Sequence, residues 1–133
     1  MKNVILITGG AKRLGSLIAQ ELCKDNSIII IHYNKSEKEA NYTKNKIHQN
    51  GGKVFLIKKN IINENDASSL IDNSLNFIKN IEIDQFTLIN NASAFIYDEG
   101  KDFNEKILDD HMHANFKIPV LLIKSLYEKI STH

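Results

Sequence analysis

Glycine, threonine and basic side chains gather early in the chain, directly after the apolar run that begins at Val4. The sequence there is Thr8-Gly9-Gly10-Ala11-Lys12-Arg13-Leu14-Gly15. Glycines in such a turn let the backbone adopt positive φ or approach a ligand without an intervening Cβ. A helix that starts here offers free N–H groups and a positive dipole end to a phosphate, and an arginine can bind the same phosphate bidentately. The turn predicts a nucleotide-phosphate site; the alternative is a tight strand-to-helix turn without a ligand.

A second polar group follows the apolar run Ser27–Tyr33 and reads Tyr33-Asn34-Lys35-Ser36, with no carboxylate before Glu37. An acidic residue at this point would bind a ribose 2′-hydroxyl and repel a 2′-phosphate. Lys35 and Arg13 instead supply positive charge, while Asn34 and Ser36 supply hydrogen-bond donors. This composition favours NADPH over NADH. In the alternative interpretation Lys35 is solvated and Ser36 only caps a helix, since Ser36-Glu37-Lys38-Glu39 has the form of a capping box.

Apolar runs alternate with helical patterns along the chain, which is typical of βαβ units and a parallel sheet. Right-handed crossovers between four such strands give the order 3-2-1-4 and predict an α/β fold with a doubly wound parallel sheet of the Rossmann type. Ligands of such sheets bind beyond the strand C-termini, where the strand order reverses, so the polar groups above fall at one edge. The expected strands are Val4–Thr8, Ser27–Tyr33, Lys53–Lys58 and Phe86–Ile89, and the expected helices are Leu14–Lys24, Ser36–His48, one starting near Asn63, and one from Asn104 to the end.

Three of these helices carry further signals. Asn63 is an expected N-cap, and Pro119 is expected to kink or divide the last helix. Apolar residues at helical spacing are expected to make the first helix amphipathic and to face inward on the third. They are Leu17, Ile18, Leu22 and Cys23 in the first helix, and Leu70, Ile71, Leu75 and Ile78 in the third.

The composition restricts the class of protein. A length of 133 residues is enough for one domain, and we treat residues 1–133 as a single unit. The formal net charge of +1 does not indicate a nucleic-acid partner. The lone Cys23 excludes an internal disulfide and fits a reducing compartment. No apolar run could span a bilayer and no signal segment is recognisable, so we expect a cytoplasmic protein without a membrane partner.

Three short motifs carry a resemblance to a known family. The first turn reads T-G-x-x-x-R-x-G and resembles the T-G-x-x-x-G-x-G turn of the short-chain dehydrogenase/reductase family. Arg13 takes the place of the middle glycine, and this departure resembles the pteridine reductase branch. The stretch His32–Ser36 and the run Asn90–Ser93, followed by Phe95, are similar to that branch as well.

The resemblance implies an NADPH-dependent oxidoreductase acting on a small molecule, such as a pterin. Ser93 would contact cofactor and substrate, and Phe95 would stack on a flat bicyclic substrate, unless it serves only loop packing. Asn115 matches the asparagine that supports the family's proton relay. Asn60 stands where the family commonly has an aspartate near the adenine. The implied cofactor-binding residues are Thr8, Gly9, Arg13, Leu14, Gly15, Tyr33, Asn34, Lys35, Ser36, Asn60, Ile61, Asn91, Ala92 and Ser93.

The resemblance covers residues 1–133 but only the first half of the family's fold, so the catalytic Tyr-x-x-x-Lys is expected to be missing. Tyr42 and Lys46 have that spacing, but they lie on the helix after the second strand, away from the expected nicotinamide end. His111 and His113 are two residues apart and so point to different helix faces, and we expect no metal site.

Three hypotheses remain open at this point. The chain is a truncated or split reductase, a nucleotide-binding module without chemistry, or a decayed remnant of such a reductase. In each case the open fourth strand and the apolar last helix predict self-association, as a homo-oligomer, or a partner that supplies the missing strands.

Overall fold

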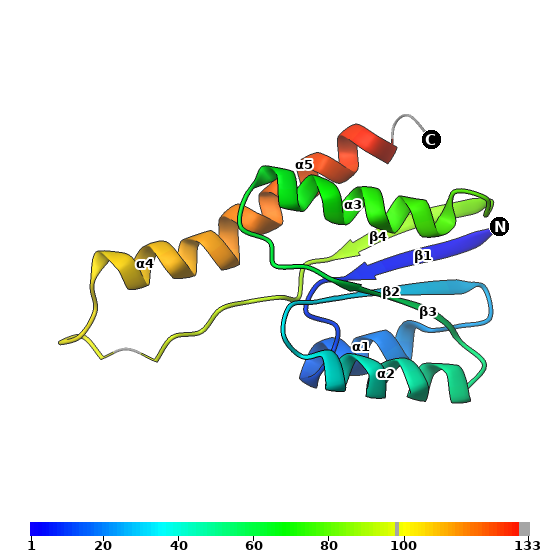
Figure 1. The fold of residues 1–133 in the computed structure, drawn as a ribbon, viewed down its shortest axis with the longest axis horizontal. Coiled ribbons are helices and arrows are strands. Elements are labelled where there is room, and N and C mark those ends of the chain that lie inside the picture. Colours follow the sequence, from blue (N-terminus) through cyan, green and yellow to red (C-terminus); the bar gives the residue numbers. More distant parts are fainter. Residues whose placement is uncertain (98, 131–133) are drawn as a thin grey trace.

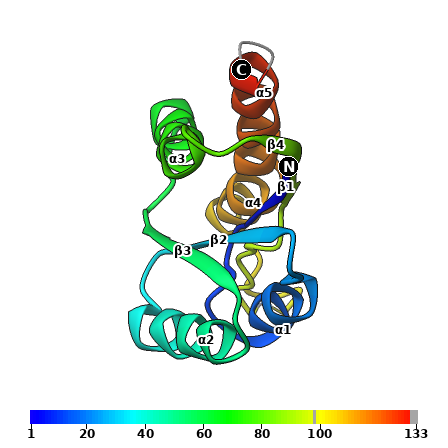
Figure 2. The same cartoon turned by 90° about the vertical axis from the view of Figure 1, so that its right-hand side faces the viewer.

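The computed structural model describes residues 1–97 and 99–130 and shows a parallel sheet between two layers of helices (Figure 1). Helices α1 and α2 cover one face of the sheet, and α3 and α5 cover the other (Figure 2). The elements are β1 (Lys2–Ile7), α1 (Arg13–Leu22), β2 (Ser27–Tyr33), α2 (Glu37–Gln49), β3 (Lys53–Lys58), α3 (Glu64–Ile78), β4 (Ile83–Ile89), α4 (Glu105–Met112), the π-helical segment η1 (His113–Lys117) and α5 (Ile118–Ile130).

The sheet has the order β3-β2-β1-β4 and confirms the predicted order 3-2-1-4. All of its pairings are parallel, with Ile5 opposite Ile29 and Leu6 opposite Leu88. The strand order reverses between β1 and β4, because β2 follows β1 on one side and β4 lies on the other. The C-terminal ends of these strands therefore form the switch point at which ligands of open α/β sheets bind.

The continuous apolar run of β2 reflects burial on both faces of the sheet. Ile28 and Ile30 pack into the core beneath α3 and α5, while Ile29 and Ile31 pack into the core beneath α1 and α2. Every residue of β2 is buried, as expected for a central strand of a parallel sheet. The inward face predicted for α3 is also confirmed, since Leu70 and Ile71 are fully buried.

Helix α1 contacts the core with small side chains rather than with its leucines. Gly15, Ser16 and Ala19 are its buried residues, whereas Leu17 and Leu22 are 61% and 37% exposed. Of the four apolar residues that predicted an amphipathic helix, Ile18 and Cys23 pack against the core, while the two leucines do not face it. The small residues let α1 approach closely, so that the Ser16 hydroxyl reaches Thr43 of α2 at 2.7 Å.

Cys23 at the C-terminal end of α1 is partly buried against the same core. Burial raises the pKa of its thiol. This environment suits a packed side chain rather than a reactive thiolate.

Of the two predicted helix N-caps, Asn63 caps its helix with its side chain and Ser36 does not. Asn63 accepts a hydrogen bond from the Asp66 N–H, and Asp66 completes a capping box. Ser36 occupies the N-cap position of α2, but its side chain makes no capping hydrogen bond. The predicted capping box with Glu39 is wrong, because Ser36 has φ −81° and ψ 56° rather than the extended backbone of a capping serine.

The last helix is divided, as Pro119 predicted. Instead of one helix from Asn104 there are α4, the π-helical segment η1 and α5, and the residues after Ile130 lie outside the described part. A proline lacks an N–H and clashes with the carbonyl four residues earlier, here that of Asn115. The π-helical segment accommodates this mismatch. Together, α4 and η1 form an arm that projects beyond the sheet (Figure 1).

Strand ends differ from the predicted ones by a few residues. Strand β1 spans Lys2–Ile7 rather than Val4–Thr8, and β4 begins at Ile83 rather than at Phe86. None of the helices within the described residues is long and apolar enough to cross a bilayer.

Candidate functional site

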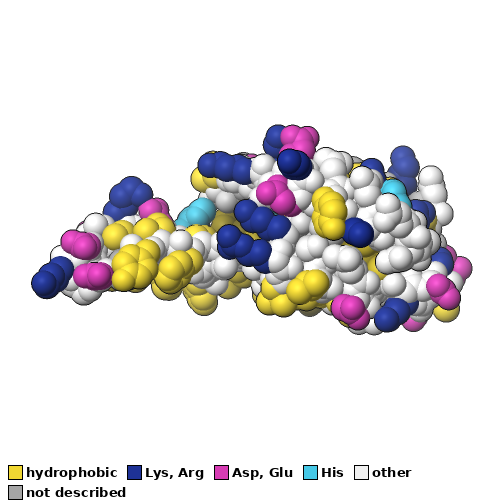
Figure 3. Space-filling view, turned by 90° about the horizontal axis from the view of Figure 1, so that it is seen from below, with side chains coloured by type: hydrophobic (Ala, Val, Ile, Leu, Met, Phe, Trp, Pro, Cys, Tyr) yellow, Lys and Arg dark blue, Asp and Glu magenta, His cyan; other side chains and the backbone are white. Residues whose placement is uncertain are grey.

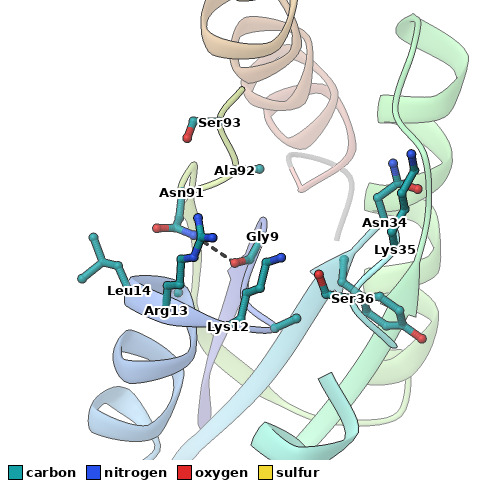
Figure 4. A pocket seen from close by; sticks show the side chains of 13 residues that line it. Gly9, Lys12, Arg13, Leu14, Asn34, Lys35, Ser36, Asn91, Ala92 and Ser93 are labelled. Atoms are coloured by element: carbon teal, nitrogen blue, oxygen red, sulfur yellow. Dashed lines mark hydrogen bonds between the residues drawn. The ribbon is translucent and has the colours of Figure 1, made fainter. Parts of the chain in front are cut away.

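A cavity of about 620 Å³ lies beyond the C-terminal ends of β1, β2 and β4 (Figure 4). It brings together eleven of the residues predicted for the site, from three separate stretches of sequence. Lys12 and Arg13 lie on one side of it, and Asn34 and Lys35 on the other. The lining residues are Gly9, Ala11, Lys12, Arg13, Leu14, Gly15, Tyr33, Asn34, Lys35, Ser36, Asn91, Ala92 and Ser93.

The glycines of the first turn allow its close contact with the turn after β4. Gly9 has φ +61°, and a Cβ built on it would lie 3.0 Å from the Ala92 Cα. A Cβ on Gly15 would overlap the Gly9 carbonyl oxygen and lie 2.6 Å from the Asn91 side-chain nitrogen. Neither position accepts a side chain without opening the floor of the cavity.

Thr8 lies outside the cavity lining but holds the two turns together. Its buried hydroxyl accepts hydrogen bonds from the N–H groups of Asn91 at 3.1 Å and Ala92 at 3.0 Å. The Asn91 amide donates in return to the carbonyls of Thr8 at 3.1 Å and Gly9 at 3.0 Å. Side chains and backbone of the two turns are thus linked in both directions.

The electrostatics of the cavity suit an anion. Lys12, Arg13 and Lys35 line it, and none of its thirteen lining residues carries a carboxylate. Lys12 is the N-cap of α1 and its side chain makes no capping hydrogen bond, so the first N–H groups of the helix can bind a ligand. Lys12 was not among the cofactor-binding residues predicted from the sequence. Its position next to Arg13 at the start of a helix could have indicated it.

Arg13 has a backbone conformation that is unusual for a side chain of its size. Its φ is +52°, in the left-handed region, and it is the one non-glycine residue of the described chain with positive φ. This conformation costs about 1–2 kcal/mol for a residue with a Cβ. The exposed Arg13 lines the cavity, near Asn91 and Lys12 in the view of Figure 4, so conformational strain and positive charge occur at the same residue.

His32, at the end of β2, is buried and links three segments of the site. Its Nε2–H donates to the Lys59 carbonyl at 2.8 Å, and its Nδ1 accepts from the Gly9 N–H at 3.4 Å. Only the neutral imidazole can make both bonds. Burial lowers the pKa of His32, an effect partly opposed by the bond to Lys59.

A smaller cavity of about 190 Å³ adjoins the main one and shares Asn34, Ala92 and Ser93 with it. It contains Asn60 and Ile61, two of the predicted cofactor-binding residues, and the Asn34 amide donates to the Asn60 side-chain oxygen at 3.3 Å. The residues that sequence reasoning missed here come from the end of β2, the end of β3 and the start of the last helices. They are His32, Lys59, His113, Ala114 and Ile118.

Asn115 and Phe95 lie outside both cavities. The Asn115 amide forms two hydrogen bonds with the backbone of Ala94, accepting from its N–H at 2.8 Å and donating to its carbonyl at 2.9 Å. The Phe95 ring is 84% exposed and is not packed within a loop.

The remaining candidates are separated from the cavities. Tyr42 and Lys46 lie on α2, where the ammonium group sits 5.5 Å from the ring centroid, and neither lines a cavity of the site. His111 and His113 bind different backbone groups, the Ile96 N–H and the Ile62 carbonyl. Over residues 1–97 and 99–130, no three His, Cys, Asp or Glu side chains gather as metal ligands.

Comparison with known proteins gives a consistent result. The family model described as short chain dehydrogenase matches residues 3–133. The short-chain dehydrogenase/reductase homolog YusS of Bacillus subtilis (strain 168) is 30% identical over 93 residues, which cover 70% of this chain and 82% of that protein. The hydroxynaphthalene reductase-like protein Arp2 of Metarhizium brunneum is 23% identical over 94% of this chain and 45% of its own length.

Among solved structures, a short chain dehydrogenase from Burkholderia cenocepacia J2315 in complex with NADP superposes with a TM-score of 0.80. It is 22% identical, and the match covers 93% of this chain and 49% of that one. The chain thus spans about half the length of Arp2 and of this structure.

Replacing Arg13 by glycine is expected to raise the free energy of unfolding by up to about 1 kcal/mol. Relief of the left-handed strain exceeds the extra entropy that glycine gains in the unfolded chain. Urea denaturation measures the change. Lys12→Gly is the matched control, because Lys12 has φ −146° and its replacement removes a charge without relieving strain. An equal gain in both variants would show that loss of charge, and not backbone strain, is responsible.

Stability is expected to fall with acidification because of His32. Its pKa in the folded protein is lowered from the ordinary 6.5, so the unfolded chain takes up a proton first as the pH decreases. The stability that neutral His32 contributes is fully present above pH 6.5. It is lost as the pH falls from 6.5 toward the lower pKa of the folded protein. His32→Asn is expected to flatten the dependence of the unfolding free energy on pH between about 7 and 5. A wild-type curve that is flat over this range would contradict the assignment.

Proposed function

Because the chain belongs to the short-chain dehydrogenase family, we propose that it forms the cofactor-binding half of an NADPH-dependent oxidoreductase. The supporting observation is the cavity at the switch point between β1 and β4, which has a glycine turn, three basic side chains and no lining carboxylate. NADPH carries a diphosphate and a 2′-phosphate, and such a cavity is complementary to both.

The diphosphate would bind at the N-terminus of α1, next to Lys12 and Arg13. There the free N–H groups, the helix dipole and two cationic side chains act together. Gly9 and Gly15 leave room for the backbone to approach the ligand, because a Cβ at either position meets the neighbouring turn.

The 2′-phosphate would bind at the end of β2. Lys35 supplies the charge, and Asn34 and Ser36 supply donors; the Ser36 hydroxyl makes no capping bond to its helix. The adenine would occupy the smaller cavity, where Asn60 and Ile61 lie beside the shared Asn34. Tyr33 and Leu14 complete the walls of the main cavity.

The substrate would lie on the side of Ser93 and Phe95. Ser93 lines both cavities, and Phe95 presents an exposed ring two residues further on. An aromatic face of this kind suits a flat bicyclic compound. The resemblance to pteridine reductases points to a pterin, and the name of the relative Arp2 indicates a hydroxynaphthalene, which is also flat and bicyclic.

NADPH supplies the hydride, but the proton donor for the substrate would come from polypeptide beyond these 133 residues. Asn115 is proposed to support the proton relay. Tyr42 and Lys46 lie on α2 and do not line the cavities, which favours a catalytic Tyr-x-x-x-Lys supplied elsewhere. The same observation supports the alternative that the chain alone is a nucleotide-binding module. A cytoplasmic location, where NADPH and reduced thiols coexist, fits this proposal and the free Cys23.

We also propose that the chain associates with a second copy, or with a partner that supplies further strands. Strand β4 is an edge of the sheet, and hydrophobic side chains gather along the projecting arm (Figure 3). Exposed apolar residues follow one another every three or four positions through α4, η1 and α5, as on one side of a helix. They are Leu108, Met112, Phe116, Val120, Ile123 and Tyr127.

The cofactor proposal is tested by replacing Lys35 with glutamate. We expect NADPH binding to weaken by about 1 kcal/mol or more, and NADH binding to change less, because a charge-assisted contact to the 2′-phosphate is lost. Titration of both nucleotides against wild type and variant measures this, with the exposed Lys24→Glu as control for net charge. Equal losses for the two nucleotides would rule out a 2′-phosphate contact at Lys35.

The proposed association is tested by placing a charged side chain in the middle of the row of exposed apolar residues that runs from Leu108 to Tyr127. Phe116→Glu is expected to shift the chain toward monomer in light scattering at several concentrations, because a carboxylate would be desolvated in the contact. Tyr42→Glu is the matched control, since Tyr42 and Phe116 are 62% and 61% exposed. A wild-type chain that remains monomeric at every concentration would contradict self-association.

A further inference from the structure

The segment after Ser93 is held against the arm by two side chains that lie one helical turn apart. Asn115 binds both backbone groups of Ala94, and His111 accepts a hydrogen bond from the Ile96 N–H at 2.9 Å. The spacing of four residues places these side chains on one side of the helix. Residues 94–96 are therefore attached at both ends, although they belong to no regular element.

The hydrogen bond from the Ile96 N–H determines which tautomer of the His111 imidazole fits this contact. An N–H can only donate, so the Nε2 atom must be unprotonated, and the ring is the neutral tautomer with its proton on Nδ1. An imidazolium, or a side chain without an acceptor, cannot make this contact.

The same imidazole supports the ring of Phe95. The two rings stack with centroids 6.5 Å apart and an interplanar angle of 20°. This is an offset arrangement within the favourable range for aromatic pairs. His111 thus lies beside the Phe95 ring and binds the next residue through its nitrogen, while the Phe95 side chain remains 84% exposed and open to a ligand.

We propose that His111 is a positioning residue, which fixes Phe95 as the preformed aromatic wall of a slot for a flat bicyclic ligand. The slot and its ligand rest on the proposed function; the attachment of the segment to the arm does not. If Phe95 is already ordered in the free protein, binding does not have to order its side chain. The entropic cost of binding is then smaller, and the affinity is higher without any new contact. The hydrogen bond from the Ile96 N–H to His111 is the main contact that positions the segment, and the stacking of the His111 and Phe95 rings contributes less.

Three substitutions separate these contributions. His111→Gln retains an acceptor and loses the stack, His111→Phe retains an aromatic ring and loses the acceptor, and His111→Ala loses both. Amide hydrogen exchange at Ile96, followed by NMR on the whole chain, measures the attachment of the segment. Biopterin fluorescence, titrated in the presence of saturating NADP⁺, measures the slot, and an NADPH titration confirms that each variant retains the cofactor site.

The Ile96 amide is expected to exchange about fivefold faster in the Ala and Phe variants, the factor that corresponds to one net hydrogen bond. It is expected to remain close to wild type in the Gln variant. The biopterin Kd is expected to rise in the same two variants by a similar factor, while NADPH affinity stays unchanged in all three.

The contrary outcomes are distinguishable. Unchanged exchange at Ile96 in His111→Ala would overturn the positioning role, whatever the ligand does. Retained biopterin affinity in His111→Phe would assign the effect to ring stacking and contradict the role of the hydrogen bond. A wild-type chain that binds NADPH but not biopterin would overturn the slot, whereas failure to bind NADPH at all would overturn the proposed function itself.

Discussion

Hydrogen bonds between Thr8 and Asn91 hold the turn after β1 against the turn after β4, and the cavity depends on that contact. The Thr8 hydroxyl receives two backbone N–H groups, and the Asn91 amide donates to two backbone carbonyls. Gly9 and Gly15 permit the contact because neither carries a Cβ that would separate the turns. His32 adds a third link, from the same turn to the end of β3. The backbone around the cavity is thus held by a partly buried polar network in which Thr8, Asn91 and His32 all have hydrogen-bond partners.

Arg13 shows how this site departs from an ideal strand-to-helix turn. A glycine at the same position would adopt φ +52° without strain, but it would carry no charge to the mouth of the cavity. The arginine retains a destabilising backbone conformation and contributes a guanidinium next to Lys12. Strain of this kind persists only where the surrounding structure fixes the backbone, and it is typical of binding sites.

The strand order and most of the cavity could be predicted from the sequence, because they follow from local patterns and general rules. The isoleucine run of β2 indicates a doubly buried strand, and right-handed crossovers then place the turns after β1 and β4 side by side. Hydrophobicity predicts the inward face of α1 only in part. Ile18 and Cys23 pack against the core, but Leu17 is exposed and the small residues Gly15 and Ala19 are buried in its place.

Contacts between residues far apart in the chain also could not be predicted from the sequence. His113 reaches the smaller cavity only because the last helices pack beside the sheet, and no local pattern indicates this. Pro119 indicated a break but not its form, and the π-helical segment that precedes it carries Asn115. The neighbours of single residues could not be predicted, because they depend on how helices and strands pack rather than on the periodicity of the sequence.

The link between Thr8 and Asn91 also has a kinetic consequence, because it joins residues separated by 83 positions. Closing so long a loop is costly in chain entropy, and non-local contacts in a parallel sheet form slowly. The contact between the turns after β1 and β4 is therefore expected to form late in folding, after the local pairing of β1 with β2. A ligand that touches both turns binds the native state and not the unfolded chain. Such a ligand is expected to lengthen the lifetime of the folded protein by slowing unfolding, while leaving the rate of folding nearly unchanged.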